Sequence, residues 1–301
     1  MFEKKERKLT SILTVFFLFG LLMMAGSVQA DLNKAKEHFN TAVKAKQEAN
    51  VEGAIIAYKA AINEAPDYVD PYVNLGAIYF ERKDYENALD MFRKATEVDK
   101  TNIGAFSNLG RVEFKLKKYA EAEAAFKSAL GLDPTNVELL KDVGKVYYYK
   151  RNYTELIDAL SKCHANGGGD YLTHFMLGKG YQKSDKNTEA IAAYKKSISL
   201  KSNNYNSQFA LGQIYLAQQK YQSAAGAFRA AMKANSKKYL AAYNYAIALE
   251  TNDPDDLTTN IAAWEGFVRS AKNNPKAKTQ LAEAQNHIKE LKELKEHQDL
   301  Q

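Results

Sequence analysis

The sequence contains one cysteine, Cys163, so no disulfide can form within the chain. Cys163 stands where comparable segments of the sequence carry a small residue, and we predict that it packs as a small hydrophobic side chain. Intermolecular pairing of the thiol is the alternative. Histidine is also scarce, and none of the five histidines stands at a usual metal-ligand spacing from another histidine, a cysteine or a carboxylate.

The nearest approach to a metal cluster is Cys163, His164 and His174, but Cys163 is predicted to be buried while His164 should face outward. The usual catalytic motifs are missing too. The glycines at 167–169 lack the preceding strand and the following Lys-Ser/Thr of a phosphate loop, and there is no nucleophile elbow. We therefore predict a protein that is not an enzyme and has no cofactor and no metal.

The charge balance is modest. The formal net charge is +6 and the sequence pI is about 9.0, which alone does not argue for nucleic acid as a partner.

A glycine inside an apolar run recurs at a fixed step of 34 residues. The positions are Gly76, Gly110, Gly144, Gly178 and Gly212, and the same step reaches the small residues Ala42 and Ala246. A fixed period of this length is typical of a solenoid of stacked supersecondary units.

A second signature follows each glycine in the same register. It consists of a small residue, an aromatic four positions later and another small residue three positions after that, as in Ala88, Phe92 and Ala95. This spacing places the three side chains on one helix face, so each repeat should hold two amphipathic helices. Glycine costs about 1 kcal/mol in a helix relative to alanine, and we expect the compensation to be close approach of the paired helix and its aromatic.

These motifs resemble the tetratricopeptide repeat family, whose unit is a helix–turn–helix of 34 residues. The resemblance covers residues from about 35 to 275. Pro66 and Pro134 match the proline at the end of the family's unit, whereas Lys100, Ser202 and Ser236 replace it elsewhere. The resemblance implies an all-α fold, an α-α superhelix (a right-handed solenoid) of about seven helix pairs with a capping helix at the C-terminus.

The fourth repeat departs from the pattern. It carries Leu156 and Leu160 in place of the small and aromatic residues, and it ends in the three glycines at 167–169, which do not favour helix. We interpret this as local repacking with a flexible turn; a hinge between repeats one to four and five to seven is the alternative.

The N-terminal segment has the pattern of a targeting signal. Basic residues from Lys4 to Lys8 precede an uncharged apolar run over 9–28, and Val28-Gln29-Ala30 offers a cleavage site after Ala30. An uncleaved anchor is the alternative, because about 20 apolar residues can span a bilayer. Either way we expect export, to the periplasm or to the inner membrane with the repeats facing the periplasm.

The predicted domains are therefore a signal peptide at 1–30, a repeat solenoid at 31–274 and a C-terminal helix at 275–301. Leu281, Ala284, Ile288 and Leu291 form one narrow apolar stripe on that last helix. We predict that it caps the seventh repeat; a short coiled coil with a partner is the alternative.

The resemblance further implies that the first helices of the repeats line a concave groove that binds an extended or helical peptide. Helical phase places basic and aromatic residues in this groove from the third repeat to the fifth. The predicted peptide-binding residues are Arg111, Phe114, Lys115, Lys141, Lys145, Tyr148, Tyr149, Phe175, Lys179 and Lys183.

Stacked like charges repel one another without a counter-charge, so this basic, aromatic groove predicts a protein or peptide partner with an acidic segment. The predicted function is a non-catalytic protein–protein interaction scaffold of the cell envelope. The alternatives are a merely solvated basic face, binding of an anionic envelope polymer, and an assembly or regulatory subunit of an envelope enzyme complex. We expect no nucleic acid, and a membrane only through an uncleaved N-terminal segment.

Overall fold

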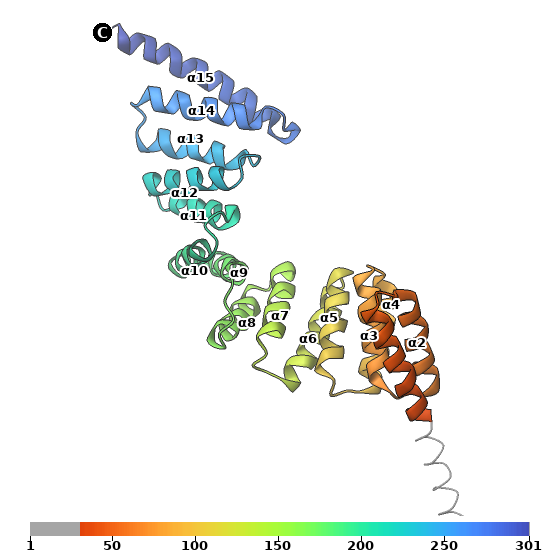
Figure 1. The fold of residues 1–301 in the computed structure, drawn as a ribbon. Helices are drawn as coiled ribbons and strands as arrows, with labels where there is room; N and C mark the ends of the chain where they lie inside the picture. Colours follow the sequence, from red (N-terminus) through yellow and green to blue (C-terminus); the bar gives the residue numbers. More distant parts are fainter. Residues whose placement is uncertain (1–30, 301) are drawn as a thin grey trace, which may run out of the picture. The chain divides into compact units, whose positions relative to one another are not determined.

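The computed structural model describes residues 31–300, and all regular structure in this part of the chain is helical (Figure 1). The predicted signal segment and its cleavage after Ala30 lie outside the described residues. The helices are 31–47, α2 (Val51–Glu64), α3 (Val69–Glu81), α4 (Tyr85–Val98), α5 (Ile103–Lys115), α6 (Tyr119–Leu132), α7 (Val137–Lys150), α8 (Tyr153–Ala165), α9 (Tyr171–Lys183), α10 (Asn187–Leu200), α11 (Tyr205–Ala217), α12 (Tyr221–Ala234), α13 (Leu240–Asn252), α14 (Leu257–Ala271), the 3₁₀ turn η1 (Pro275–Ala277) and α15 (Lys278–Asp299).

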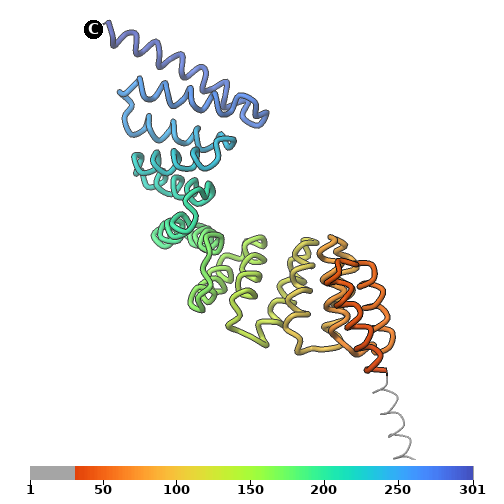
Figure 2. Tube along the Cα trace, in the orientation of Figure 1, coloured from red at the N-terminus to blue at the C-terminus, as the bar shows by residue number. Residues whose placement is uncertain are grey.

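Within each unit, consecutive helices such as α3 and α4, or α9 and α10, pack against each other, and the Cα trace turns back on itself between the two members of a pair (Figure 2). The predicted all-α architecture of repeated helix pairs is confirmed. The chain forms two compact units, one up to Val146 and one from Tyr147 onward, and the boundary falls within α7. In the second unit α15 packs on α14 and buries Ala284, Ile288 and Leu291, three of the four residues of the predicted stripe.

The repeat glycines lie in close contact with an aromatic ring of the paired helix, which is the contact expected to compensate for their cost in helix stability. A Cβ added to Gly110 would lie 2.8 Å from Cε1 of Phe126, and one added to Gly212 would lie 2.7 Å from Cε1 of Phe228. Gly76 and Gly178 meet the aromatic of their own repeat in the same way. These aromatic side chains are at most 1% exposed, so each ring fills the space that a methyl group would need.

The turn between the two helices of a pair repeats in backbone shape but not in sequence. At the same position of each turn, one residue has a φ of 58–62°. These residues are again 34 apart: Ala49, Lys83, Lys117, Arg151, Asp185 and Gln219. None of them is glycine, although this left-handed region disfavours a Cβ. Helices commonly end with one residue in this conformation, because it lets the next amide groups reach back to the carbonyls of the last turn.

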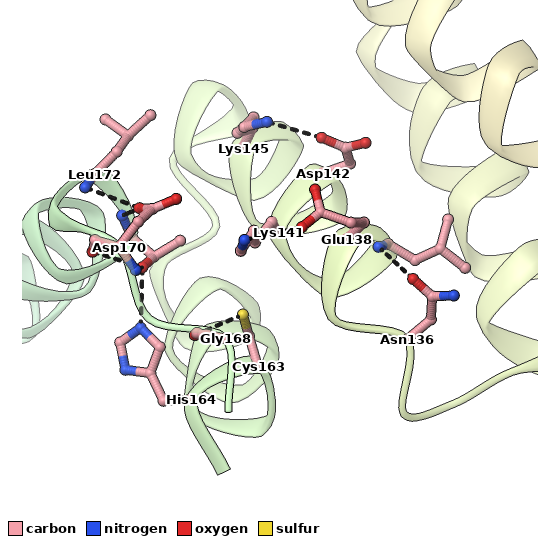
Figure 3. Close-up of polar contacts among 12 residues, drawn as sticks. Asn136, Glu138, Lys141, Asp142, Lys145, Cys163, His164, Gly168, Asp170 and Leu172 are labelled. Carbon is pink, nitrogen blue, oxygen red and sulfur yellow. Dashed lines mark hydrogen bonds and ion pairs between the residues drawn. The ribbon is translucent and has the colours of Figure 1, made fainter. Parts of the chain in front are cut away.

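The turn at the three glycines is held by several hydrogen bonds. Gly167 has φ of +83°, and the N–H of Gly168 donates to the carbonyl of Cys163 at 2.9 Å. The thiol of Cys163, which is fully buried, donates in turn to the carbonyl of Gly168 at 3.0 Å (Figure 3). Asp170 then caps α9 by accepting from the N–H groups of Leu172 and Thr173. These bonds define the local shape of the turn, and the hinge between repeats one to four and five to seven stays a prediction.

Candidate functional site

The predicted peptide-binding residues lie on the first helices of three successive repeats, α5, α7 and α9. The boundary within α7 divides them between the two compact units. Arg111, Phe114, Lys115, Lys141 and Lys145 belong to the first unit, and Tyr148, Tyr149, Phe175, Lys179 and Lys183 to the second. Each unit has its own pocket, and we describe the two separately.

The first pocket, which we call the Asp142 pocket, has a volume of about 280 Å³. Three phenylalanines, three cations and one carboxylate line it: Phe80, Phe114, Phe126, Arg111, Lys115, Lys145 and Asp142. Because one carboxylate already lies among these cations, part of their positive charge is offset before any acidic ligand binds.

Asp142 bridges two helices of the first unit. Its Oδ2 accepts a hydrogen bond from Nε of Arg111 at 2.7 Å. Its Oδ1 accepts one from Nζ of Lys145 at 2.8 Å, as Figure 3 shows. The Asp142 side chain is only 11% exposed. Both contacts are short charge-assisted hydrogen bonds, so the single carboxylate is shared by the two cations and offsets one of their two positive charges.

In the first unit, part of the predicted basic ladder therefore has a counter-charge within the chain itself. Asp142, on the first helix of the next repeat, supplies a counter-charge to Arg111 of α5 and to Lys145 one turn along α7. Lys141 has a similar arrangement: its Nζ lies 2.9 Å from Oε1 of Glu138 (Figure 3). It is not among the residues that line either pocket.

The second pocket, which we call the tyrosine pocket, has a volume of about 410 Å³. It is lined by three tyrosines and three cations: Tyr148, Tyr149, Tyr153, Arg151, Lys179 and Lys183. No carboxylate belongs to this lining, in contrast to the Asp142 pocket. The lining of the tyrosine pocket therefore supplies no negative charge to its three cations.

Lys179 is held by an amide and not by an acid. Its Nζ lies 3.4 Å from Oε1 of Gln182, and the same oxygen accepts a hydrogen bond from the hydroxyl of Tyr194 at 3.0 Å. Burial, and then the positive charge of Lys183, lowers the pKa of Lys179 below its usual range. A lowered lysine pKa means that the ammonium form is destabilised, and a bound anion would reverse this.

Aromatic rings give the tyrosine pocket a fixed wall. The ring of Tyr148 meets that of Tyr149 edge-on with centroids 5.7 Å apart, and Phe175 packs behind it at 6.3 Å. Phe175 also contacts Tyr194, so it supports the wall and does not line the pocket. Tyr149 is 57% exposed and presents its ring to solvent.

The predicted peptide-binding set omits five residues that line these pockets, Phe80, Phe126, Asp142, Arg151 and Tyr153, and it also omits Gln182, which contacts Lys179. Asp142 was detectable, since it stands three positions before Lys145 on a helix, where opposite charges pair. Gln182 stands three positions after Lys179, a spacing at which side chains on a helix also lie side by side. Arg151 and Tyr153 follow the end of α7, and only the turn geometry brings them to the pocket.

The cluster of Cys163, His164 and His174 is used for packing. The two imidazole rings lie with centroids 4.1 Å apart, and Nε2 of His164 is 3.1 Å from Oγ1 of Thr173. Burial, and then the neighbouring His164, lowers the pKa of His174 to about 4. Within residues 31–300, no three histidine, cysteine, aspartate or glutamate side chains come together in a way that could hold a metal ion.

No helix within residues 31–300 combines the length and the apolar composition needed to cross a membrane.

Two family models, both described as Tetratricopeptide repeat, match the chain. One matches residues 69–102 and 104–136, and the other matches 175–238 and 209–275. Together they cover more than half of the sequence, and the chain belongs to the tetratricopeptide repeat family. The fold is that of a protein–protein interaction scaffold. No curated protein matches the chain.

Several solved structures share the fold. The C-terminal part of a TPR repeat-containing protein from Cytophaga hutchinsonii is 19% identical, with a TM-score of 0.64 and coverage of 81% of this chain and 99% of that one. For PilF of Pseudomonas aeruginosa the identity is 21%, the TM-score 0.56 and the coverage 73% and 97%. YrrB, described as a TPR protein with an unusual peptide-binding site, is 20% identical with a TM-score of 0.54 and coverage of 61% and 93%. At these identities the likeness shows the fold alone.

Proposed function

We propose that the protein is a non-catalytic scaffold that captures an acidic segment of a partner protein in the tyrosine pocket. The observation that carries the proposal is the composition of that pocket, which combines three cations with three tyrosines and no carboxylate. An acidic side chain would meet Lys179, Lys183 and Arg151, while the tyrosine rings would cover its apolar neighbours.

The Asp142 pocket has a different role in this proposal. Because Asp142 already pairs with Arg111 and Lys145, a carboxylate entering here would gain less than in the tyrosine pocket. The three phenylalanines make this pocket suited to an apolar side chain of the partner. YrrB, a neighbour in fold, is described as having a peptide-binding site, which agrees with a peptide as ligand.

The proposal is tested by fluorescence anisotropy with a labelled peptide of alternating glutamate and phenylalanine. Lys179→Glu combined with Lys183→Glu should weaken binding at least about tenfold, because two favourable charge contacts become repulsive. Lys195→Glu is the matched control: it reverses the same charge on α10, where Lys195 is exposed and lies outside the pocket lining. Equal losses in the pocket variant and the control would show that general charge, and not the pocket, attracts the peptide.

An anionic polymer of the envelope is the second candidate ligand, because the same three cations would attract it. The salt dependence of binding distinguishes the acidic peptide from the anionic polymer. Binding that rests on charge alone is lost steeply as salt rises, whereas a peptide that also buries phenylalanine against the tyrosine rings retains part of its affinity. A polyphosphate chain of defined length serves as the polymer probe in the same assay.

We also propose that the protein is exported to the cell envelope. The support is the sequence of residues 1–30, with its basic start, its apolar run and the cleavage site after Ala30. Fractionation of cells that express the full chain should place the protein in the periplasmic fraction, with a new N-terminus at Asp31 if the segment is cleaved. Recovery of the intact chain in the cytoplasmic fraction would contradict export.

A further inference from the structure

A separate cleft lies at the C-terminal end of the second unit, between the end of α14 and the start of α15. It has a volume of about 920 Å³, and the turn that carries η1 closes one end of it. On the α14 side it is lined by Val268, Arg269 and Lys272, and on the α15 side by Lys278, Leu281 and Gln285. It shares no residue with the tyrosine pocket. Its volume is in the range of sites that hold a ligand.

The floor of the cleft is apolar and well supported. Val268 and Leu281 are partly buried and pack on a hydrophobic cluster that contains Trp264, Phe267 and Ile288. Phe267 is fully buried there. Because this floor belongs to the same core that joins α14 to α15, the cleft is already formed before a ligand arrives.

The position of α15 beside this floor is fixed by a polar network. Oε2 of Glu250 accepts a hydrogen bond from the indole N–H of Trp264 at 2.7 Å, and Oε1 of the same carboxylate is 2.8 Å from Nε2 of His287. An ion pair of 2.8 Å between Lys292 and Glu265 joins the two helices farther along. The two walls of the cleft are therefore tied to each other and to α13.

The rim of the cleft is cationic. Three cations line it and no carboxylate does. Arg269 has Glu265 at 3.9 Å, but Glu265 is bound more closely by Lys292. Lys272 and Lys278 form no ion pair with any residue of the described chain, 31–300. The cleft thus combines an apolar floor with uncompensated positive charge on both walls.

We propose that this cleft is a second docking site, which binds a partner segment that carries one apolar side chain flanked by carboxylates. The apolar side chain lies on Val268 and Leu281, and the carboxylates meet Lys272 and Lys278 from either side. Charge complementarity selects this occupant, because a neutral apolar segment would leave the cations unpaired and a purely acidic one would leave the floor exposed.

The test uses a fluorescein-labelled peptide in which one leucine is flanked by three aspartates on each side, with binding to the full chain followed by anisotropy. Lys272→Glu combined with Lys278→Glu should weaken binding by about tenfold or more. Lys289→Glu, an exposed charge reversal on α15 outside the cleft, should change it by less than about twofold. A peptide with serine in place of leucine should bind the unaltered protein about fivefold more weakly, since the apolar contact is lost. The emission of Trp264, the one tryptophan, reports whether α15 stays docked in each variant.

Several outcomes would overturn the proposal. If Lys289→Glu weakens binding as much as the double variant does, or if the serine peptide binds equally well, the peptide is held by general charge attraction. If Lys179→Glu with Lys183→Glu abolishes binding of this peptide, it occupies the tyrosine pocket. If the double variant instead loses a concentration-dependent self-association in sedimentation, a second copy of the chain fills the cleft.

Discussion

Replacing Gly212 by alanine is expected to lower the free energy of unfolding by about 1 kcal/mol, although alanine is the better helix former. The added Cβ would lie 2.7 Å and 2.8 Å from two ring atoms of Phe228. Phe228 is fully buried in a cluster with Ala224, Ala225 and Ala248, so its ring has no free space to enter. Overpacking of this kind costs about 1–3 kcal/mol, which exceeds the helix-propensity gain of about 1 kcal/mol.

Gly226 provides the matched control within the same repeat. It lies in the middle of α12, is exposed, and an added Cβ there would meet no atom within 4 Å. Gly226→Ala should therefore raise the free energy of unfolding by about 0.5–1 kcal/mol through helix propensity alone. Urea unfolding followed by circular dichroism measures both variants. A stabilised Gly212→Ala variant would show that the ring of Phe228 moves aside at little cost, and the packing argument would fail.

Replacing Glu113 by glutamine is expected to stabilise the protein at pH 8 by about 1–2 kcal/mol and to have little effect at pH 5. Glu113 is only 5% exposed, and its Oε2 is buried without a hydrogen-bond partner. Burial, and then the negative charge of Glu121, raises the pKa of the Glu113 carboxyl to about 7. Arg93 and Lys118 act in the opposite direction and reduce the effect.

The sign follows from proton linkage. A carboxyl with a raised pKa in the folded state holds its proton more tightly there than in the unfolded chain. Its unfavourable contribution is thus absent below the unfolded pKa and grows as the pH rises from about 4.5 through about 7. Glutamine stays neutral throughout, so the difference in unfolding free energy between variant and wild type should increase over this window. Glu97→Gln, at an exposed position of α4, should show no such increase. A difference for Glu113→Gln that stays flat from pH 5 to pH 8 would rule out the shifted titration.

Much of the fold was predictable because the helix pair is encoded within each repeat. The step of 34 residues identified the unit, and the glycine and the aromatic that fills the space beside it could be matched by register alone. The four contacts of Gly76, Gly110, Gly178 and Gly212 with their rings confirm that prediction. Periodicity was a strong signal here because the same local interaction occurs many times in one chain.

The inter-helix turns were less predictable. The residues in the left-handed conformation are alanine, lysine, arginine, aspartate and glutamine, which share no preference for that region. The conformation results from the way two packed helices must be joined, so the residue type at the turn carries no signal. At 167–169 the glycines did predict a turn, and Gly167 has a positive φ, but the hydrogen bond from the thiol of Cys163 to the carbonyl of Gly168 was not predictable.

The predicted binding residues lie on α5, α7 and α9, the first helices of their repeats, but their electrostatic contacts were not predicted. Helical phase alone predicted that the basic residues share a face of their helices. Which side chain pairs with each of them also depends on residues from neighbouring helices. Asp142 compensates Arg111 across 31 residues of sequence, whereas Lys179 meets only the amide of Gln182. Two positions that look equivalent in the repeat therefore differ in the charge they can offer to a ligand.

The sequence alone determined the repeat, the helix pairs and the pairing of glycine with aromatic, because these depend on contacts within one unit of 34 residues. The tertiary structure alone decided which cations keep an unbalanced charge and where the apolar floor of the C-terminal cleft lies. Those properties depend on distances of a few ångströms between side chains of different helices, and a residue's own position in its repeat does not specify them.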